Sequence, residues 1–169
     1  MQPTQIQPPV PPPMPPIVRY AGFWRRFVAH LIDQIIIGIV AFMLFIPGLA
    51  LIGIGIGAGI SDESPSAIGF IFAAIAAYLT AILLIIILQW LYYALMESSN
   101  RQATLGKLAL GIVVTDLNGG RISFGRATGR YFGKIISGMI LYIGFIMAGF
   151  TERKQALHDI MASCLVVLK

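Results

Sequence analysis

Between Ala67 and Met96 the chain reads AIGFIFAAIAAYLTAILLIIILQWLYYALM, thirty residues without a charged side chain. A helix needs about 20 apolar residues to cross the hydrocarbon core of a bilayer. This segment exceeds that length, and Trp90, Tyr92 and Tyr93 near its end are typical of the membrane–water interface. It predicts a transmembrane helix and therefore an integral membrane protein.

The composition of the whole chain agrees with this class. Of its 169 residues, 57% are hydrophobic and 11% are charged, and the mean hydropathy is +0.84. Soluble domains contain about 25% charged residues. The pI near 9.7 indicates anionic lipid rather than nucleic acid as a partner, because the basic residues are not clustered with aromatic ones on a soluble face. The single cysteine, Cys164, excludes an internal disulfide.

The first sixteen residues differ in composition from the rest. They contain eight of the ten prolines and no charged side chain. We expect residues 1–16 to form a solvated, polyproline-like tail, either a plain leader or a ligand for a proline-binding module. The tail lacks the basic start and long apolar core of a signal peptide. Residues 17–168 are expected to form one membrane domain.

The first spanning helix is predicted from Gly22 to Phe45, where an apolar run follows three arginines. Pro47-Gly48 is expected to break or kink it, because proline removes a helical hydrogen bond. The glycine-rich run Leu49–Ile60 then continues either as a helical extension or as a re-entrant turn.

The polar segment from Glu97 to Lys134 predicts a small β element. Residues 111–123 have the pattern of a β-hairpin turned at Asn118-Gly119, since Asn-Gly suits a type I′ turn. The last apolar run, Ser163–Leu168, predicts a strand. The 111–123 hairpin is its obvious partner.

A basic helix is predicted after this hairpin. Ser123 suits an N-cap, and the spacing becomes helical from there. Arg126, Arg130 and Lys134 recur every four residues and therefore share one face. We expect this amphipathic helix to lie on the bilayer surface, with its three cations against anionic lipid.

The third apolar run, residues 135–150, is short. As a helix its sixteen residues cover about 24 Å, less than the ~30 Å of the hydrocarbon core. Basic residues flank it on both sides, whereas the 61–66 loop carries only acidic ones. The positive-inside rule therefore places both termini in the cytoplasm, which makes this run a re-entrant hairpin. The alternative is a third crossing with the C-terminus outside. The predicted fold is an all-α integral membrane protein with two full transmembrane helices, a third short membrane segment and a small cytoplasmic β-hairpin.

Asp33 is the only charged residue between Arg26 and Asp62. An ionised aspartate at the centre of a membrane helix costs about 2.5–3.5 kcal/mol on insertion scales, so we expect it to be paired. Arg26, His30 and Asp33 follow an i, i+4, i+7 spacing and share one helix face.

A second polar group lies near the C-terminus, where His158 and Asp159 end the cluster 151–159. We expect Asp33 and Asp159 to belong to one polar network with Arg26 and a basic residue from 151–154.

Three roles are open for these charged residues. They could lock helices together, or they could form a proton or cation path. Metal binding is disfavoured because neither His30 with Asp33 nor His158 with Asp159 has a recognised metal spacing. No catalytic constellation is present, and Gly53–Ala58 has the form of a dinucleotide fingerprint without the preceding soluble strand. We expect neither an enzyme nor a bound cofactor.

Four motifs occur in order along the chain. They are AGFWRRFVAHLID at residues 21–33, QATLGKLALGIVVTDLNGGR at 102–121, SFGRA at 123–127 and QALHD at 155–159. Together they resemble the RDD family of bacterial membrane proteins, over about residues 17–168. The arginine and two aspartates that name this family map onto Arg26, Asp33 and Asp159, with Arg25 an adjacent alternative to Arg26.

The resemblance implies a multi-pass protein of the bacterial inner membrane and leaves two functions open. Some members are linked to sodium/proton antiport, which implies a small cation/proton-coupled transporter. We would expect it to be a homo-oligomer, since so few spans leave little room for a pathway within one subunit. The domain also occurs in proteins of membrane quality control. The alternative is therefore a scaffold or assembly factor whose Arg/Asp network is structural.

Overall fold

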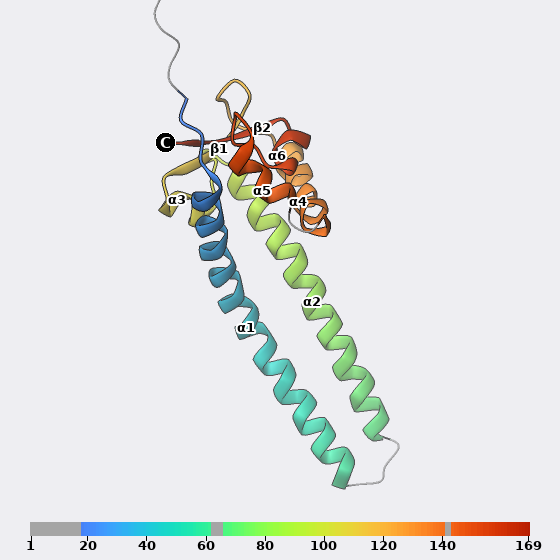
Figure 1. The fold of residues 1–169 in the computed structure, drawn as a ribbon. Helices are drawn as coiled ribbons and strands as arrows, with labels where there is room; N and C mark the ends of the chain where they lie inside the picture. The colour runs from blue at the N-terminus through green and yellow to red at the C-terminus, as the bar shows by residue number, and fades with distance from the viewer. Residues whose placement is uncertain (1–17, 62–65, 141–142) are drawn as a thin grey trace, which may run out of the picture.

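Two long helices dominate the computed structural model. It describes residues 18–61, 66–140 and 143–169. Helix α1 runs from Phe23 to Ser61 and helix α2 from Ser66 to Ser98, and the two lie side by side with opposite directions (Figure 1). The predicted tail at residues 1–16 and most of the predicted 61–66 loop lie outside the described residues.

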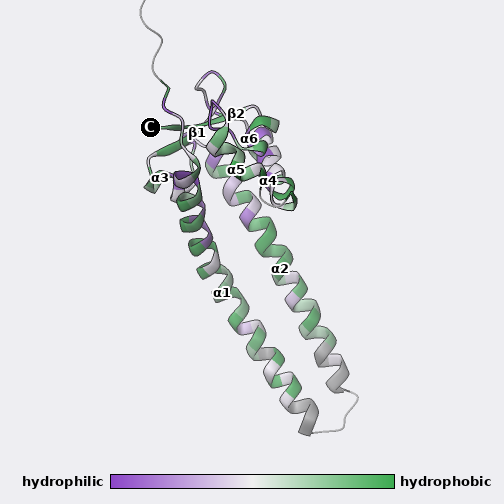
Figure 2. Cartoon of the chain, viewed as in Figure 1, coloured by the Kyte–Doolittle hydropathy of each residue, from purple (hydrophilic) through white to green (hydrophobic). Residues whose placement is uncertain are grey.

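Both helices are long and apolar enough to cross a membrane, over Phe23–Gly57 and Phe72–Ser98. Hydrophobic residues cover much of their length, whereas hydrophilic residues gather at the end where α1 begins (Figure 2). Large side chains such as Phe42 and Phe72 face outward on this pair. Outward apolar faces of this extent suit contact with lipid. The prediction of two helices that can span is confirmed.

Pro47 lies inside α1 and does not end it. The glycine-rich run after it is also helical, so the helical extension is confirmed and the re-entrant turn at residues 49–60 is wrong. A helix satisfies its own backbone hydrogen bonds, and lipid offers no partners for an irregular turn. One lost bond at Pro47 therefore costs less than an open turn would.

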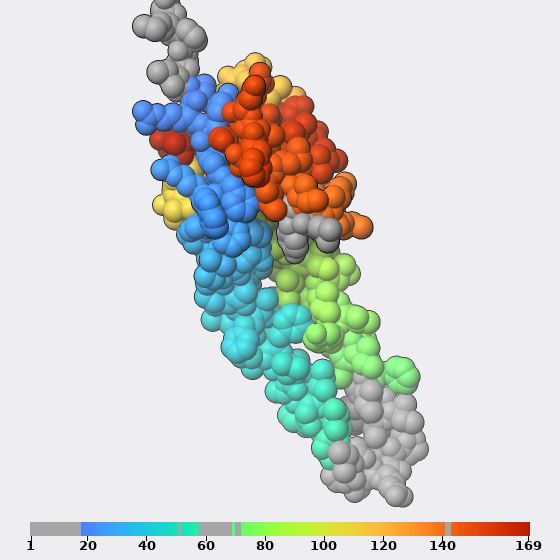
Figure 3. Space-filling model, in the orientation of Figure 1, coloured from blue at the N-terminus to red at the C-terminus, as the bar shows by residue number. Residues whose placement is uncertain are grey.

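The remaining helices pack around the first turns of α1 and the last turns of α2 (Figure 1). They are α3 (Leu105–Ala109), α4 (Phe124–Met139), α5 (Ile143–Phe150) and α6 (Leu157–Met161). The Ser123 side chain accepts a hydrogen bond from the Arg126 amide, which confirms the predicted N-cap of α4. In the space-filling view the start of α1 lies against the C-terminal segments (Figure 3).

Helices α4 and α5 meet at an angle of 103° across a short break. This bent pair contains the third apolar run. The two helices pack closely, because a Cβ added at Gly144 of α5 would lie 2.8 Å from the Cβ of Ser137 in α4. Such a bend fits either a broken span or a re-entrant segment.

A two-stranded antiparallel sheet joins β1 (Ile112–Asp116) to β2 (Cys164–Leu168), with Val114 opposite Val166. This confirms the predicted strand near the C-terminus and its partner. Tyr20, just before α1, forms a bridge with Val167. The segment just before α1 and strand β2 are therefore held at the same end of the α1–α2 pair.

The predicted hairpin at 111–123 is wrong, because only its first arm is a strand. Asp116 accepts hydrogen bonds at Oδ1 from the amides of Asn118 and Gly120, so a turn does form, and Gly119 takes a positive φ of 83°. The chain then runs to Ser123 without a second arm. Strand β2 instead occupies the edge of β1.

Candidate functional site

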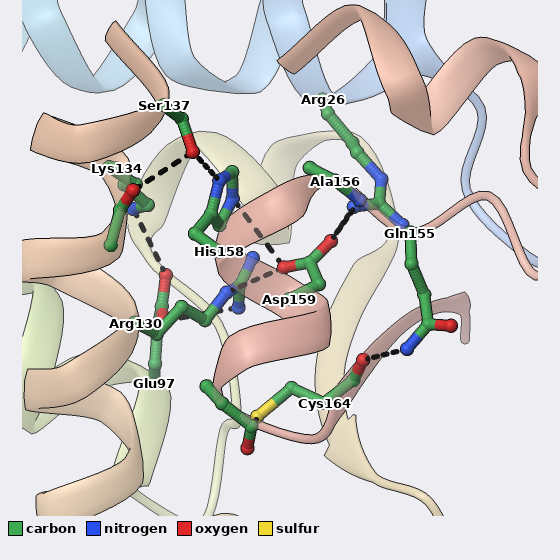
Figure 4. Close-up of polar contacts among 12 residues, drawn as sticks. Arg26, Glu97, Arg130, Lys134, Ser137, Gln155, Ala156, His158, Asp159 and Cys164 are labelled. Carbon is green, nitrogen blue, oxygen red and sulfur yellow. Dashed lines mark hydrogen bonds and ion pairs between the residues drawn. The ribbon is translucent and has the colours of Figure 1, made fainter. Parts of the chain in front are cut away.

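Asp159 lies at the first turn of α6 and is fully buried. Arg26 of α1 forms an ion pair with its Oδ2, and Arg130 of α4 donates from Nε to its Oδ1 at 2.8 Å (Figure 4). The backbone amide of Ala156 donates to the same carboxylate at 3.1 Å. One carboxylate thus joins the start of α1, the middle of α4 and the turn before α6.

Glu97, at the end of α2, is the second buried carboxylate. Lys107 of α3 donates to its Oε1 at 2.5 Å, and Arg130 donates from Nη1 to its Oε2 at 3.2 Å. The ammonium of Lys134 lies 3.7 Å from Oε1. Because Arg130 contacts both Glu97 and Asp159, its guanidinium links the two carboxylates into one network. A planar guanidinium with several donors suits this bridging position.

Asp33 of α1 is 1% exposed and has a different set of partners. The hydroxyls of Tyr92 and Thr104 donate to it at 2.8 Å and 2.6 Å, and the amide of Gly106 donates at 2.8 Å. Tyr92 also accepts from the amide of Leu105 at 3.0 Å. Neutral donors from α2 and from the region of α3 therefore hold this carboxylate.

The two histidines flank these networks. Nδ1 of His30 lies 3.2 Å from the hydroxyl of Tyr93. His158 lies with Nδ1 3.4 Å from the hydroxyl of Ser137 and Nε2 3.5 Å from Asp159. The Lys134 ammonium sits 3.9 Å from the centre of the Tyr93 ring, within the range of a cation–π interaction.

Burial and ion pairing set the charges of this region. Burial alone disfavours charge on Asp159, but Arg130 and Arg26 outweigh it and hold the pKa of this carboxyl well below its usual range. Burial lowers the pKa of His158 to about 3, so its imidazole is neutral at physiological pH. Burial and the charge of Arg130 lower the pKa of Lys107 to about 7, against the opposing effect of Glu97.

The structure brings Arg26 and Asp159 together but separates Asp33 from them. Asp33 is bound by hydroxyls and an amide, so the prediction of one network through both aspartates is wrong. The basic residue that joins Arg26 at Asp159 is Arg130, not one from 151–154. Within that segment, Lys154 donates to the carbonyl of Gly149.

The predicted lipid-facing stripe is wrong for Arg130. Arg126 is exposed, but Arg130 is 2% exposed, and the side chain of Lys134 is 16% exposed beside Glu97. Arg130 and Lys134 turn inward because Glu97 and Asp159 supply negative charges there, whereas Arg126 stays exposed.

A cavity of about 310 Å³ adjoins both networks. Its wall includes four basic residues, Arg26, Lys107, Arg130 and Lys134. It also includes His30, Asp33 and His158, with apolar residues that include Phe23, Phe27, Phe145 and Ile146. The cavity wall thus combines basic side chains with a larger set of apolar ones. Among the described residues, no group of three or more His, Cys, Asp or Glu side chains is placed to hold a metal ion.

Glu97, Lys107 and Thr104 were not predicted as site residues. Glu97 is the first charged residue after the thirty-residue apolar run, a position that also suits an ordinary solvated helix end. Thr104 and Lys107 lie in the motif QATLGKLALGIVVTDLNGGR. That motif indicated the family, but it did not indicate that these two side chains bind Asp33 and Glu97.

Comparison with known proteins identifies relatives of the chain. The model of the RDD family matches residues 20–163. The uncharacterized protein YxaI of Bacillus subtilis (strain 168) is 40% identical over 151 residues, which cover 88% of this chain and 97% of the relative. The uncharacterized membrane protein YteJ of the same organism is 31% identical over 154 residues, covering 88% of this chain and 80% of the relative. No solved structure gives a significant match.

Proposed function

This chain belongs to the RDD family, and we propose that it is a membrane scaffold or assembly factor whose buried charges are structural. One observation carries this proposal. Among the described residues, each of the three buried carboxylates takes donors from two elements other than its own. Asp33 of α1 binds Tyr92 of α2 and the region of α3, Glu97 of α2 binds α3 and α4, and Asp159 of α6 binds α1 and α4.

These partners favour a fixed structure over a proton path. Asp159 receives two guanidinium contacts and one amide, and Asp33 receives three donors. The guanidinium of Arg130 beside Asp159 holds the pKa of that carboxyl below its usual range, so Asp159 resists protonation. Removing one member of such a buried set leaves the others unpaired, which costs about 3–5 kcal/mol. The network is therefore suited to holding α3, α4 and α6 against the two long helices.

The proposal includes a topology in the cell membrane. Both termini lie in the cytoplasm, and the bent pair α4–α5 re-enters without crossing. The bridge between Tyr20 and Val167 supports a position of both termini on the same side of the membrane. The abundance of basic residues at this end supports the cytoplasm as that side.

A second candidate function is cation/proton-coupled transport. His30, Asp33 and Lys107 line one cavity, and the lowered pKa of Lys107 would allow that amine to exchange a proton near neutral pH. Ionisable groups around a cavity in a membrane protein often serve proton transfer. The excess of basic residues on the cavity wall argues against a cation as the transported species.

Purified protein in proteoliposomes separates the two functions. A scaffold leaves an imposed proton gradient intact when sodium or potassium is added, and Asp33→Asn lowers the folded yield. Glu152→Gln, which neutralises an exposed carboxylate, is the matched control and keeps full yield. A wild-type protein that dissipates the gradient, together with a folded but inactive Asp33→Asn variant, would establish the transporter instead.

A further inference from the structure

The cavity between α1, α4 and α6 has features that a purely structural network does not require. Four basic residues line it, but only two carboxylates, Glu97 and Asp159, form ion pairs with them. Asp33 also lies on the wall. When Asp33 is counted and Lys107 carries its proton, the four positive charges exceed the three negative ones by one. A buried excess of positive charge is costly unless an anion compensates it.

Two of these cations have unused hydrogen-bonding capacity. Nη2 of Arg26 is buried and lacks a hydrogen-bond partner among the described residues. The Lys134 ammonium has an ion-pair distance of 3.7 Å to Glu97, beyond hydrogen-bonding range, and otherwise faces the Tyr93 ring. Both side chains line the same cavity. An anionic oxygen in this space would satisfy donors that the protein leaves open.

The apolar residues of the cavity wall favour an amphiphilic ligand. Phe27 is 48% exposed and Ile146 is 45% exposed, so the apolar side of the cavity reaches the surface of the molecule. This surface belongs to the first turns of α1, beside Trp24, where an interfacial aromatic belt is expected. A molecule with an anionic head and an apolar tail would place its head among the cations and its tail along α1.

We propose that this cavity binds the phosphate headgroup of an anionic membrane lipid. Its volume of about 310 Å³ admits a headgroup but not a whole lipid. Arg26 and Lys134 supply the direct contacts to the phosphate oxygens. Arg130 and Lys107, already paired to Glu97 and Asp159, supply the surrounding positive potential. Basic pockets between membrane helices suit this class of ligand.

The test compares ligands on the intact protein in detergent. Phosphatidylglycerol, phosphatidylcholine and inorganic phosphate are added at equal concentrations, and thermal unfolding is followed. We expect phosphatidylglycerol to raise the unfolding temperature, with little effect from the other two. Equal protection by inorganic phosphate would show a site for free anions and overturn the lipid. Protection by none of them, or equally by phosphatidylcholine, would overturn the proposal.

Two variants place the effect in the cavity. Lys134→Gln should weaken the binding of phosphatidylglycerol about fivefold or more, whereas Arg126→Gln, the same change on the exposed side of α4, should not. Equal losses in both would indicate surface attraction and contradict the site. Ile146→Trp narrows the cavity mouth without a change in charge and should also weaken binding. Unchanged binding in that variant would contradict the cavity even if Lys134→Gln failed to fold.

Discussion

Gly106 packs directly against the backbone of Ala29. A Cβ at position 106 would overlap the carbonyl oxygen of Ala29 and would lie 3.0 Å from the carboxyl carbon of Asp33. The same glycine donates its amide to Asp33. Only a residue without a side chain lets the backbone of α3 come close enough to α1 to bind this aspartate.

Gly106→Ala should therefore destabilise the protein by about 3 kcal/mol or more, because it separates α3 from α1 and leaves Asp33 short of a donor. The measurement is the folded yield in detergent and the temperature of unfolding. Gly129→Ala in α4 is the control, since nothing lies within 4 Å of a Cβ there. Equal stability of the two variants would contradict the close contact.

Arg130→Met should be among the most damaging substitutions in the chain. It removes the guanidinium between Glu97 and Asp159, and the lost pairing of buried carboxylates costs about 3–5 kcal/mol. Arg126→Met, one turn earlier and exposed, should change the free energy of unfolding by about 0.5 kcal/mol or less.

Arg130→Lys distinguishes geometry from charge. A single ammonium cannot reproduce the separate Nε and Nη1 contacts to two carboxylates, so this variant should lie between the wild type and Arg130→Met. Wild-type stability of Arg130→Lys would show that charge alone suffices at this position.

The spanning helices, the start of α4 and the partner of β2 could be predicted because each depends on a local pattern. An apolar run, a capping serine and a short apolar strand can each be recognised from a few consecutive residues. The sequence could not predict whether the basic face of α4 points to lipid or to the protein interior. Periodicity shows that Arg126, Arg130 and Lys134 share a face, but whether that face meets lipid or Glu97 depends on contacts between distant residues.

The partners of the two aspartates were predicted less well for the same reason. A buried carboxylate requires donors, but the requirement does not specify charged ones. Asp33 is satisfied by Tyr92, Thr104 and a backbone amide, which leave no charge signal in the sequence. Asp159 does bind Arg26. Its further partner, Arg130, comes from α4, whose cations were predicted to lie against anionic lipid.

Acid should destabilise the protein through His158. The imidazole has a pKa of about 3 in the folded state, compared with an ordinary value of 6.5. Above pH 6.5 neither state is protonated, so the contribution of His158 is complete. As the pH falls below 6.5, His158 binds a proton in the unfolded chain but stays neutral in the folded chain. Stability is then lost at up to about 1.4 kcal/mol per pH unit, until the pH reaches the folded value.

The measurement is the free energy of unfolding in detergent over this pH range, for the wild type and for His158→Asn. The neutral amide cannot take up the proton, so the variant should lose stability less steeply than the wild type on acidification. Parallel pH profiles would show that His158 does not carry the effect.

The C-terminus should be inaccessible from outside the cell. Val167 bridges to Tyr20, so the last strand and the residues before α1 are held together, and the basic residues at this end favour the cytoplasm. Lys169→Cys places a thiol at an exposed position, and Cys164→Ala removes the buried one.

An impermeant maleimide should label this double variant in broken cells but not in intact cells. Ser64→Cys, in the predicted outer loop and on the same Cys164→Ala background, is the control and should be labelled in intact cells. Labelling of Lys169→Cys from outside would contradict the cytoplasmic C-terminus. If Ser64→Cys is then also labelled in intact cells, α4–α5 is a third crossing and the Tyr20–Val167 bridge does not form in the membrane. If Ser64→Cys is not labelled in intact cells, both termini lie outside and the α1–α2 pair is inverted.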